Sequence, residues 1–232
     1  MREPSRLRRT YAQAYAWAAE RLYHELAWAY EVVAWLVSFG KWDVWRRQVL
    51  AHVVGERVLE IGFGTGVLLG VAAGRFSVVG LDPSPEMHRV AGRHLVQRRL
   101  AVPRVQGKAQ ALPFAAGSFD SVIVTFPTGY IFDPDTLAAI ARVLSADVDG
   151  RPGRCVITGL GSRSDYPVVQ RAHKGLLGGA GADAVAWFAE QVTALGFRVV
   201  VVDDAASLIR MPVLILEPLP TEVVGRGEGA YG

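Results

Sequence analysis

The 232-residue sequence has a single cysteine and no apolar run long enough to cross a membrane. The lone thiol, Cys155, excludes an internal disulfide, and its apolar neighbours predict a buried strand residue. The longest apolar stretch, residues 26–39, is interrupted by Glu31 and is shorter than the roughly 20 residues of a spanning helix. The arginine-rich N-terminus lacks the apolar core and small-residue cleavage site of a secretory signal. We therefore expect a cytoplasmic protein.

The sequence also lacks a cluster of metal-ligating residues and a separate basic domain with interleaved aromatic side chains. We therefore predict no metal site and no nucleic-acid partner. The net charge is only +3, and its excess lies at residues 2–9 and 88–104. Such an excess fits an anionic surface or an ordinary solvated helix face, so it selects no partner by itself.

Hydrophobic residues make up 51% of the chain and the mean hydropathy is +0.23, which fits a parallel sheet buried on both faces. After Gly55, short β-branched runs alternate with helical stretches, the pattern of parallel strands joined by crossover helices. The runs are 57–61, 77–81, 103–107, 119–125, 154–160, 197–203 and 211–217. The last two are too close for a helical crossover and should pair antiparallel. The predicted fold class is α/β, a doubly wound, mostly parallel seven-stranded sheet with a reversed last strand.

Residues 11–39 are rich in alanine, tryptophan, tyrosine and leucine and contain neither glycine nor proline, which favours helix. Gly40 ends this segment, and the sequence KWDVWRRQVLAHV begins a second amphipathic helix that leads into the first strand. The predicted domains are an N-terminal helical cap at residues 1–50, the main α/β domain at 51–220 and a glycine-rich, disordered tail at 221–232.

The strongest local signal is VLEIGFGTGVLL, in which three glycines follow a strand and precede a helix. This turn lies at the carboxyl end of its strand, where open α/β sheets bind ligands. Gly62, Gly64 and Gly66 let the backbone approach a ligand, and the helix N-terminus offers N–H groups to a carboxylate. Glu60 is placed to meet an ammonium group, such as that of the amino-acid moiety of S-adenosylmethionine. A glycine cluster alone is equally typical of a tight turn.

Two further elements follow in a fixed order. Asp82 ends the next strand, 20 residues after Gly62, where its carboxylate can accept both ribose hydroxyls of a nucleoside. The stretch GKAQALPFAAGSFDSVIV places a polar loop before a strand that opens with Phe119 and Asp120. With these motifs, residues 56–160 resemble the class I S-adenosylmethionine-dependent methyltransferase family.

This resemblance implies S-adenosylmethionine as the cofactor and assigns its contacts residue by residue. The implied cofactor-binding residues are Glu60, Gly62, Gly64 and Gly66 for the methionine end, Asp82 for the ribose, Ala109 and Gln110 for the adenine rim, and Thr125 after the fourth strand. Lys108 stands where the family commonly has an acidic residue that binds the adenine amino group. Either Gln110 supplies that contact, or backbone and apolar surface hold the adenine.

The leading segment AWAYEVVAWLVSFGKWDVWRR is similar to that of the ubiquinone and menaquinone methyltransferase family. This similarity implies a cap helix that closes over the cofactor and a lipophilic acceptor, quinone-like or lipid. Trp17, Trp28 and Trp35 add aromatic surface that could also make a peripheral membrane contact. A helix that only covers one edge of the sheet would explain the same pattern.

Methyl transfer from a sulfonium is an in-line displacement in which alignment is the enzyme's main task, so neither a nucleophile nor a metal is required. A proton acceptor helps when the methyl acceptor is a carbon acid, phenol or amine. The candidates lie in the loops after the fourth and fifth strands: Tyr130, Asp133, Asp165, Tyr166 and His173. Of these, Tyr130, Asp133 and His173 are the predicted catalytic residues.

Two other functions compete with methyl transfer. A nicotinamide dehydrogenase needs the pattern G-x-G-x-x-G, but Val67 occupies the place of its third glycine. A non-catalytic S-adenosylmethionine-binding regulator or partner subunit fits the same motifs, because the catalytic contribution is mostly geometric. The sequence leaves open the acceptor atom and the oligomeric state.

Overall fold

The computed structural model describes residues 42–161, 182–203 and 210–219. The strands in this part of the chain are β1 (Arg57–Ile61), β2 (Ser77–Asp82), β3 (Arg104–Gln106), β4 (Ser121–Thr125), β5 (Arg154–Thr158), β6 (Phe197–Val202) and β7 (Val213–Pro218). Each coincides with one of the runs predicted from the sequence, and the bounds differ by no more than two residues.

The strands form one seven-stranded sheet in the order β3-β2-β1-β4-β5-β7-β6. β1 lies between β2 and β4, and β1 to β5 run parallel. β7 runs antiparallel to both of its neighbours, β5 and β6. The predicted doubly wound, mostly parallel sheet with a reversed last strand is therefore confirmed.

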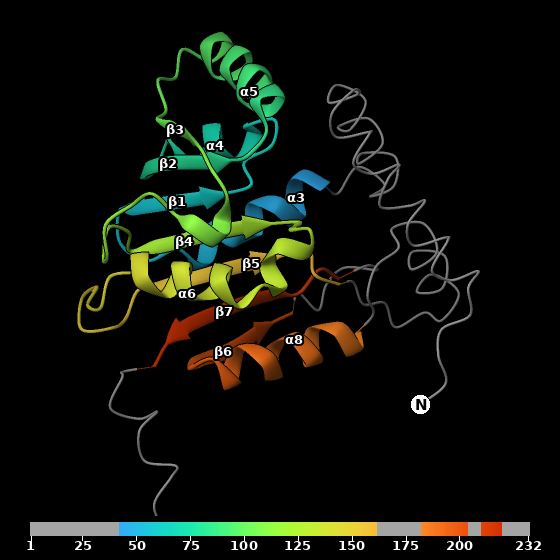
Figure 1. Cartoon of the computed structure of the whole chain (residues 1–232). Helices are drawn as coiled ribbons and strands as arrows, with labels where there is room; N and C mark the ends of the chain where they lie inside the picture. The colour runs from blue at the N-terminus through green and yellow to red at the C-terminus, as the bar shows by residue number, and fades with distance from the viewer. Residues whose placement is uncertain (1–41, 162–181, 204–209, 220–232) are drawn as a thin grey trace, which may run out of the picture.

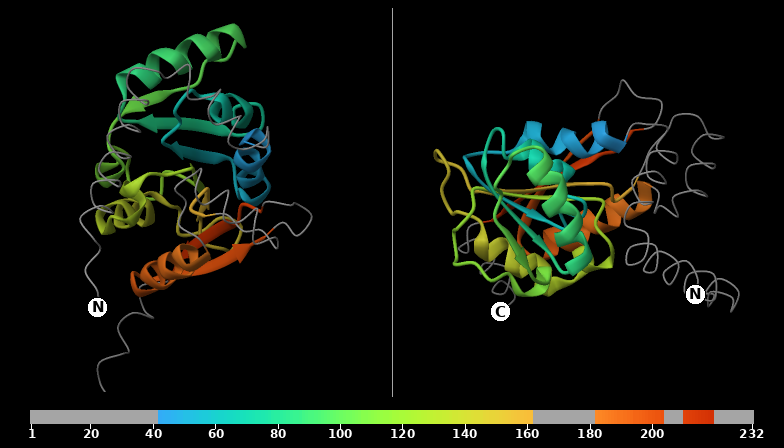
Figure 2. Two further views of the ribbon diagram at one scale, coloured as in Figure 1. Left: turned by 90° about the vertical axis from the view of Figure 1, so that its right-hand side faces the viewer. Right: turned by 90° about the horizontal axis from the view of Figure 1, so that it is seen from above.

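Helices cover both faces of the sheet (Figure 1, Figure 2). The described helices are α3 (Trp42–Arg47), α4 (Val67–Ala72), α5 (Pro85–Gln97), α6 (Pro134–Val143) and α8 (Ala182–Ala194), with the 3-10 turns η1 (Gln48–His52), η2 (Ala109–Ala111) and η3 (Gly129–Phe132). One apolar cluster joins η1, α4 and α5 to one face, and a second joins α6 and α8 to the other. The described chain thus forms three layers, with the buried sheet between two layers of helices.

Side chains alternate between the two faces along the central strands. In β1, Val58 belongs to the η1/α4/α5 cluster and Leu59 to the α6/α8 cluster, and in β4 Ile123 lies with Val58. Because alternate residues of a strand share a face, Glu60 and Thr125 point to the side of η1 and α4. This alternation decides which helices can reach the ends of β1 and β4.

Asp120, just before β4, organises the amino-terminal edge of the sheet. Its carboxylate accepts hydrogen bonds from the N–H groups of Glu56 (3.0 Å) and Arg57 (2.9 Å) and pairs with the Arg57 guanidinium (2.5 Å). Gly55 lies against it in the left-handed region (φ +65°), where an added Cβ would come within 2.4 Å of the Asp120 Cβ. The Phe-Asp motif therefore joins β1 to β4 and lies at the edge opposite the glycine turn.

The helix predicted from KWDVWRRQVLAHV is present as α3 followed by η1. The rest of the predicted cap, residues 1–41, and the predicted tail, 221–232, lie outside the described residues. Within the described ranges, no helix has both the length and the hydropathy that membrane crossing requires.

Candidate functional site

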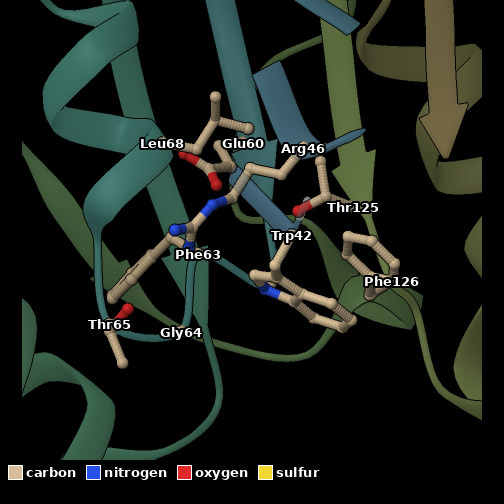
Figure 3. A pocket seen from close by; sticks show the side chains of 10 residues that line it. Trp42, Arg46, Glu60, Phe63, Gly64, Thr65, Leu68, Thr125 and Phe126 are labelled. Carbon is tan, nitrogen blue, oxygen red and sulfur yellow. The ribbon is translucent and has the colours of Figure 1, made fainter. Parts of the chain in front are cut away.

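The topology places a crevice at the carboxyl ends of β1 and β4. From β1 the chain passes outward to β2 and β3 and then returns to β4 on the other side of β1, which is the switch point at which open α/β sheets bind ligands. The strand register sets Gly62, Asp82 and Thr125 level with one another at three neighbouring strand ends. A pocket opens here (Figure 3), lined by Trp42, Arg46, Glu60, Gly62, Phe63, Gly64, Thr65, Leu68, Thr125 and Phe126.

The glycine turn after β1 forms one side of this pocket. Gly62, Gly64 and Gly66 have φ angles of 73°, 53° and 75°, in the left-handed region that other residues rarely adopt. Gly66 also packs against α5, where an added Cβ would come within 2.7 Å of the Ala91 Cβ. The backbone conformation of the turn therefore requires glycine at all three positions.

The N–H groups of the three glycines already donate hydrogen bonds within the protein. Their acceptors are the Leu81 carbonyl, an Asp82 carboxylate oxygen and the Phe63 carbonyl, at 2.7, 2.9 and 2.9 Å from Gly62, Gly64 and Gly66, respectively. The helix that follows, α4, has only six residues. A ligand carboxylate that approaches the turn therefore needs a donor other than these three amides.

Asp82 ends β2, as predicted, and only 2% of its surface is exposed. One carboxylate oxygen accepts the Gly64 N–H and the other accepts the Ser84 N–H, both at 2.9 Å. Burial raises the pKa of Asp82, and this effect exceeds the opposing effects of the two hydrogen bonds and of His88. Asp82 thus ties the glycine turn to the start of α5, which Ser84 caps.

Glu60, the penultimate residue of β1, is 1% exposed beside the pocket. Its Oε2 atom has no hydrogen-bond partner among the described residues. Burial raises the pKa of Glu60 to about 8; the charge of Arg46 opposes this shift and that of Asp82 adds to it. A buried carboxyl group with an unsatisfied oxygen at a pocket is suited to receive a ligand cation.

Arg46 was not predicted as a site residue. It reaches from α3 across the pocket toward Glu60 (Figure 3), is 8% exposed, and pairs with Asp43 one turn earlier in the helix. The sequence pattern shows only that it lies on an amphipathic helix, next to the exposed Arg47. Which of the two arginines faces the sheet depends on how α3 packs, and no local pattern encodes that.

Two aromatic rings form the side of the pocket opposite the glycine turn. Trp42 stacks on Phe126, with ring centroids 3.7 Å apart and planes 16° apart. Phe126 has a φ of 49°, which is uncommon for a residue other than glycine. Gly159 (φ +91°) makes room for it, because an added Cβ would come within 2.5 Å of the Phe126 ring. Trp45 and Met211 pack against Phe126 and help to hold this strained conformation.

The other predicted cofactor residues lie at the end of β4 and in η2, after β3. Thr125 lines the pocket, whereas Ala109 and Gln110 are not among its lining residues. Ala109 and Gln110 lie in η2, after β3; Ala109 is 6% exposed, and the Gln110 amide donates to Asp133 Oδ2 (3.2 Å). Lys108 immediately precedes η2.

The predicted catalytic residues lie in different surroundings. The Tyr130 hydroxyl is 3.5 Å from the Ile61 carbonyl, and a Cβ added to Gly62 would come within 3.0 Å of it, so Tyr130 lies beside the glycine turn. Asp133 caps α6 by accepting a hydrogen bond from the N–H of Asp135 (3.0 Å), in addition to its bond from Gln110. His173, Asp165 and Tyr166 lie outside the described residues.

The described residues contain no group of three or more histidine, cysteine, aspartate and glutamate side chains that could hold a metal ion. Cys155 lies in β5 and is fully buried, as predicted, and burial raises the pKa of its thiol.

Residues 58–147 match the family model of a methyltransferase domain. The chain is 34% identical over 149 residues to the ubiquinone/menaquinone biosynthesis C-methyltransferase UbiE of Geotalea uraniireducens, a match that covers 60% of this chain and 61% of that protein. The chain therefore spans less than two thirds of the relative's length.

Solved structures share the fold at low sequence identity. An S-adenosylmethionine-dependent methyltransferase from Aquifex aeolicus gives a TM-score of 0.56 at 16% identity, over 75% of this chain and 89% of that chain. The [4+2]-cyclase SpnF gives a TM-score of 0.58 at 16% identity, over 77% and 82%. These structures support the fold, and the cyclase shows that the fold accommodates more than one reaction. Over residues 58–147, the motifs, the domain match and the sheet topology agree with a methyltransferase domain of the class I, S-adenosylmethionine-dependent type.

Proposed function

We propose that the chain transfers a methyl group from S-adenosylmethionine to a small, lipophilic, quinone-like acceptor. The observation that carries the proposal is buried Glu60, whose unpartnered oxygen lies beside the glycine turn at the switch point of the sheet. The domain match and the 34% identity to a quinone-biosynthesis C-methyltransferase support it from sequence. The sheet topology alone does not support methyl transfer, because a cyclase shares that topology.

The described residues fit the cofactor. The ammonium group of the methionine end would satisfy Glu60 Oε2, which has no described partner. Each Asp82 oxygen accepts one protein hydrogen bond, which leaves acceptor capacity for the ribose hydroxyls. Ala109 and Gln110, after the next strand outward, would border the adenine. When bound, the cofactor supplies a methyl group activated by the positive sulfur.

In this mechanism the protein aligns the two reactants and excludes water. Alignment alone can lower a barrier by about 7–11 kcal/mol. Thr125 and Phe126, at the end of the strand beside β1, would form the acceptor's side of the pocket. C-methylation releases a proton from the acceptor, and in our proposal the Tyr130 hydroxyl, 3.5 Å from the Ile61 carbonyl, relays that proton.

The pocket's aromatic side favours a planar, apolar acceptor. Trp42 and Phe126 present stacked rings, and such surfaces bind flat rings by offset stacking. The name of the Geotalea relative states that it acts in ubiquinone and menaquinone biosynthesis. In our proposal, the tryptophan-rich segment before Trp42 brings a cytoplasmic protein to the membrane in which such acceptors dissolve.

The test is methyl transfer itself. The protein is incubated with methyl-labelled S-adenosylmethionine and a short-chain demethylmenaquinol, and the label in the organic phase and S-adenosylhomocysteine are quantified. We expect both products in equal amounts. A non-catalytic binder would be protected against thermal unfolding by the cofactor and would release no S-adenosylhomocysteine. Absence of any cofactor binding would contradict the proposal as a whole.

A further inference from the structure

Arg46 places a permanent positive charge inside the pocket. The residue is 8% exposed, and it is the one basic side chain among the described residues that line the cavity. Its ion-pair partner Asp43 has a side chain that is 51% exposed, so that pair lies toward solvent. The guanidinium also extends toward Glu60 (Figure 3). Burial of a guanidinium costs solvation free energy, which a hydrophobic side chain of similar size would avoid.

The three glycine amides of the turn offer little to a ligand carboxylate. The amides of Gly62, Gly64 and Gly66 already donate to protein acceptors, and α4 has too few residues for a strong dipole. Arg46 extends from α3 across the pocket, and its guanidinium lies on the side of Glu60 and this turn (Figure 3). A planar guanidinium can bind a carboxylate through two parallel N–H···O bonds, which backbone amides already in use cannot do.

The charges of the pocket match those of an amino acid. Arg46 presents a positive group beside the Glu60 carboxyl, which can release its proton when a ligand cation meets it. The methionine end of the cofactor carries an ammonium and a carboxylate on one carbon. Glu60 alone would bind the ammonium but leave the carboxylate buried without a partner, which is unfavourable. When Glu60 pairs with the ammonium and Arg46 pairs with the carboxylate, both charges of the ligand have a partner of opposite sign.

We infer that Arg46 binds the carboxylate of the cofactor's methionine end and so selects cofactors with an intact amino-acid group. This inference rests on the proposed function and names a residue for the same site. Arg46 on α3 then couples the helix before β1 to the presence of the cofactor, because one side chain contacts both.

The test compares two ligands that differ by the carboxylate alone. Titration calorimetry measures S-adenosylhomocysteine and decarboxylated S-adenosylhomocysteine, which keeps the amine. We expect the intact protein to prefer S-adenosylhomocysteine on the order of 10- to 100-fold, the range of a charge-assisted contact. In Arg46→Met, which keeps the apolar stem, the preference should fall below about 3-fold, with little change in affinity for the decarboxylated ligand.

Arg47→Met is the matched control. Arg47 is the next residue of α3, its side chain is 48% exposed, and it also lies near Asp43 (3.8 Å). This variant should keep the full preference for S-adenosylhomocysteine. Arg46→Lys, which retains the charge but not the fork, should keep an intermediate preference. If Arg46→Met does not fold, the lysine variant provides the comparison.

Three results would overturn the inference. Arg46→Met could weaken the binding of both ligands equally, which is the result that a purely structural role of Arg46 predicts. It could leave the preference intact, or the Arg47 variant could lose the preference as well. If the intact protein binds neither ligand, the proposed function fails before Arg46 is tested.

Discussion

At the scale of single residues, burial of Glu60 makes a large electrostatic difference between the folded and the unfolded chain. Its pKa is raised from 4.5 to about 8, chiefly by burial. Between pH 4.5 and about 8, Glu60 therefore keeps a proton in the folded state that it releases in the unfolded chain. The stability that this proton confers is complete below pH 4.5 and declines as the pH rises toward 8, by up to about 1.4 kcal/mol per pH unit.

Glu60→Gln should remove that decline. The free energy of unfolding of the ligand-free variant should exceed that of the parent at pH 8 and depend less on pH between 5 and 8, as measured by urea unfolding. Cofactor affinity should fall roughly 10- to 100-fold, because the amide cannot pair with an ammonium group. Glu56→Gln, at the exposed residue just before β1, is the control. An unchanged pH slope in Glu60→Gln would show that Glu60 is ionised in the empty pocket.

Asp82→Ala should lose both stability and cofactor affinity. The N–H groups of Gly64 and Ser84 lose their acceptors, which should lower the free energy of unfolding by about 1–3 kcal/mol. Loss of the ribose contact should weaken S-adenosylhomocysteine binding about 10-fold or more in calorimetry. A folded variant with unchanged affinity would exclude Asp82 from ribose binding.

Residue positions were predictable where local sequence determines backbone geometry. Gly62 and Gly64 line the pocket, as expected, because a strand followed by glycines fixes both the turn and its edge of the sheet. Arg46 was missed because its burial depends on the packing of α3. The use of Asp133 as a helix cap was also not foreseen, although an aspartate before Pro134 is a typical start of a helix.

At the scale of elements, the two edges of the sheet differ in function: one carries the binding pocket and the other stabilises the fold. The carboxyl edge carries the pocket, whereas the amino edge carries the Asp120 network that joins β1 to β4.

The strand runs were predictable because β-branched residues alternate with helical stretches and both faces of the sheet are buried. The order of the strands was not predictable from these runs, because it depends on contacts between distant segments. The reversal of β7 was predictable, because the connection before it is short.

Asp120→Ala should destabilise the protein without changing cofactor affinity. Hydrogen bonds and the charge of Arg57 lower the pKa of Asp120 despite the opposing effect of burial. Its stabilising effect is therefore present above the unfolded value of 3.8 and is lost as the pH falls through the lower folded value. We expect a loss of about 1–3 kcal/mol in urea unfolding at neutral pH. Weaker binding of S-adenosylhomocysteine than in the parent would contradict the separation of the two edges.

At the scale of the whole molecule, α3 connects the N-terminal region to the pocket. Trp42 and Arg46 of this helix line the cavity, and Trp45 packs with Met211 beside Phe126. The sequence predicts that the segment before α3 is a lid over the acceptor. Residues 1–41 lie outside the described chain, so this expectation stays a prediction.

Deletion of residues 1–40 tests the lid. The shortened chain keeps α3 and the entire described sheet, so it should fold and bind S-adenosylhomocysteine. Transfer to a lipophilic acceptor should be abolished, because water would reach the reacting groups. Thermal melts, cofactor titration and the transfer assay are compared with the full chain. Loss of the folded state would indicate that the segment is ordinary core.

The central claim is that the pocket at the ends of β1 and β4 holds S-adenosylmethionine. Titration calorimetry of the purified chain with S-adenosylhomocysteine, NAD and NADP tests it most directly. Glu60 and the glycine turn predict a dissociation constant for S-adenosylhomocysteine that is micromolar or lower, and much weaker binding of both nicotinamide cofactors. Tighter binding of NAD than of S-adenosylhomocysteine would contradict it.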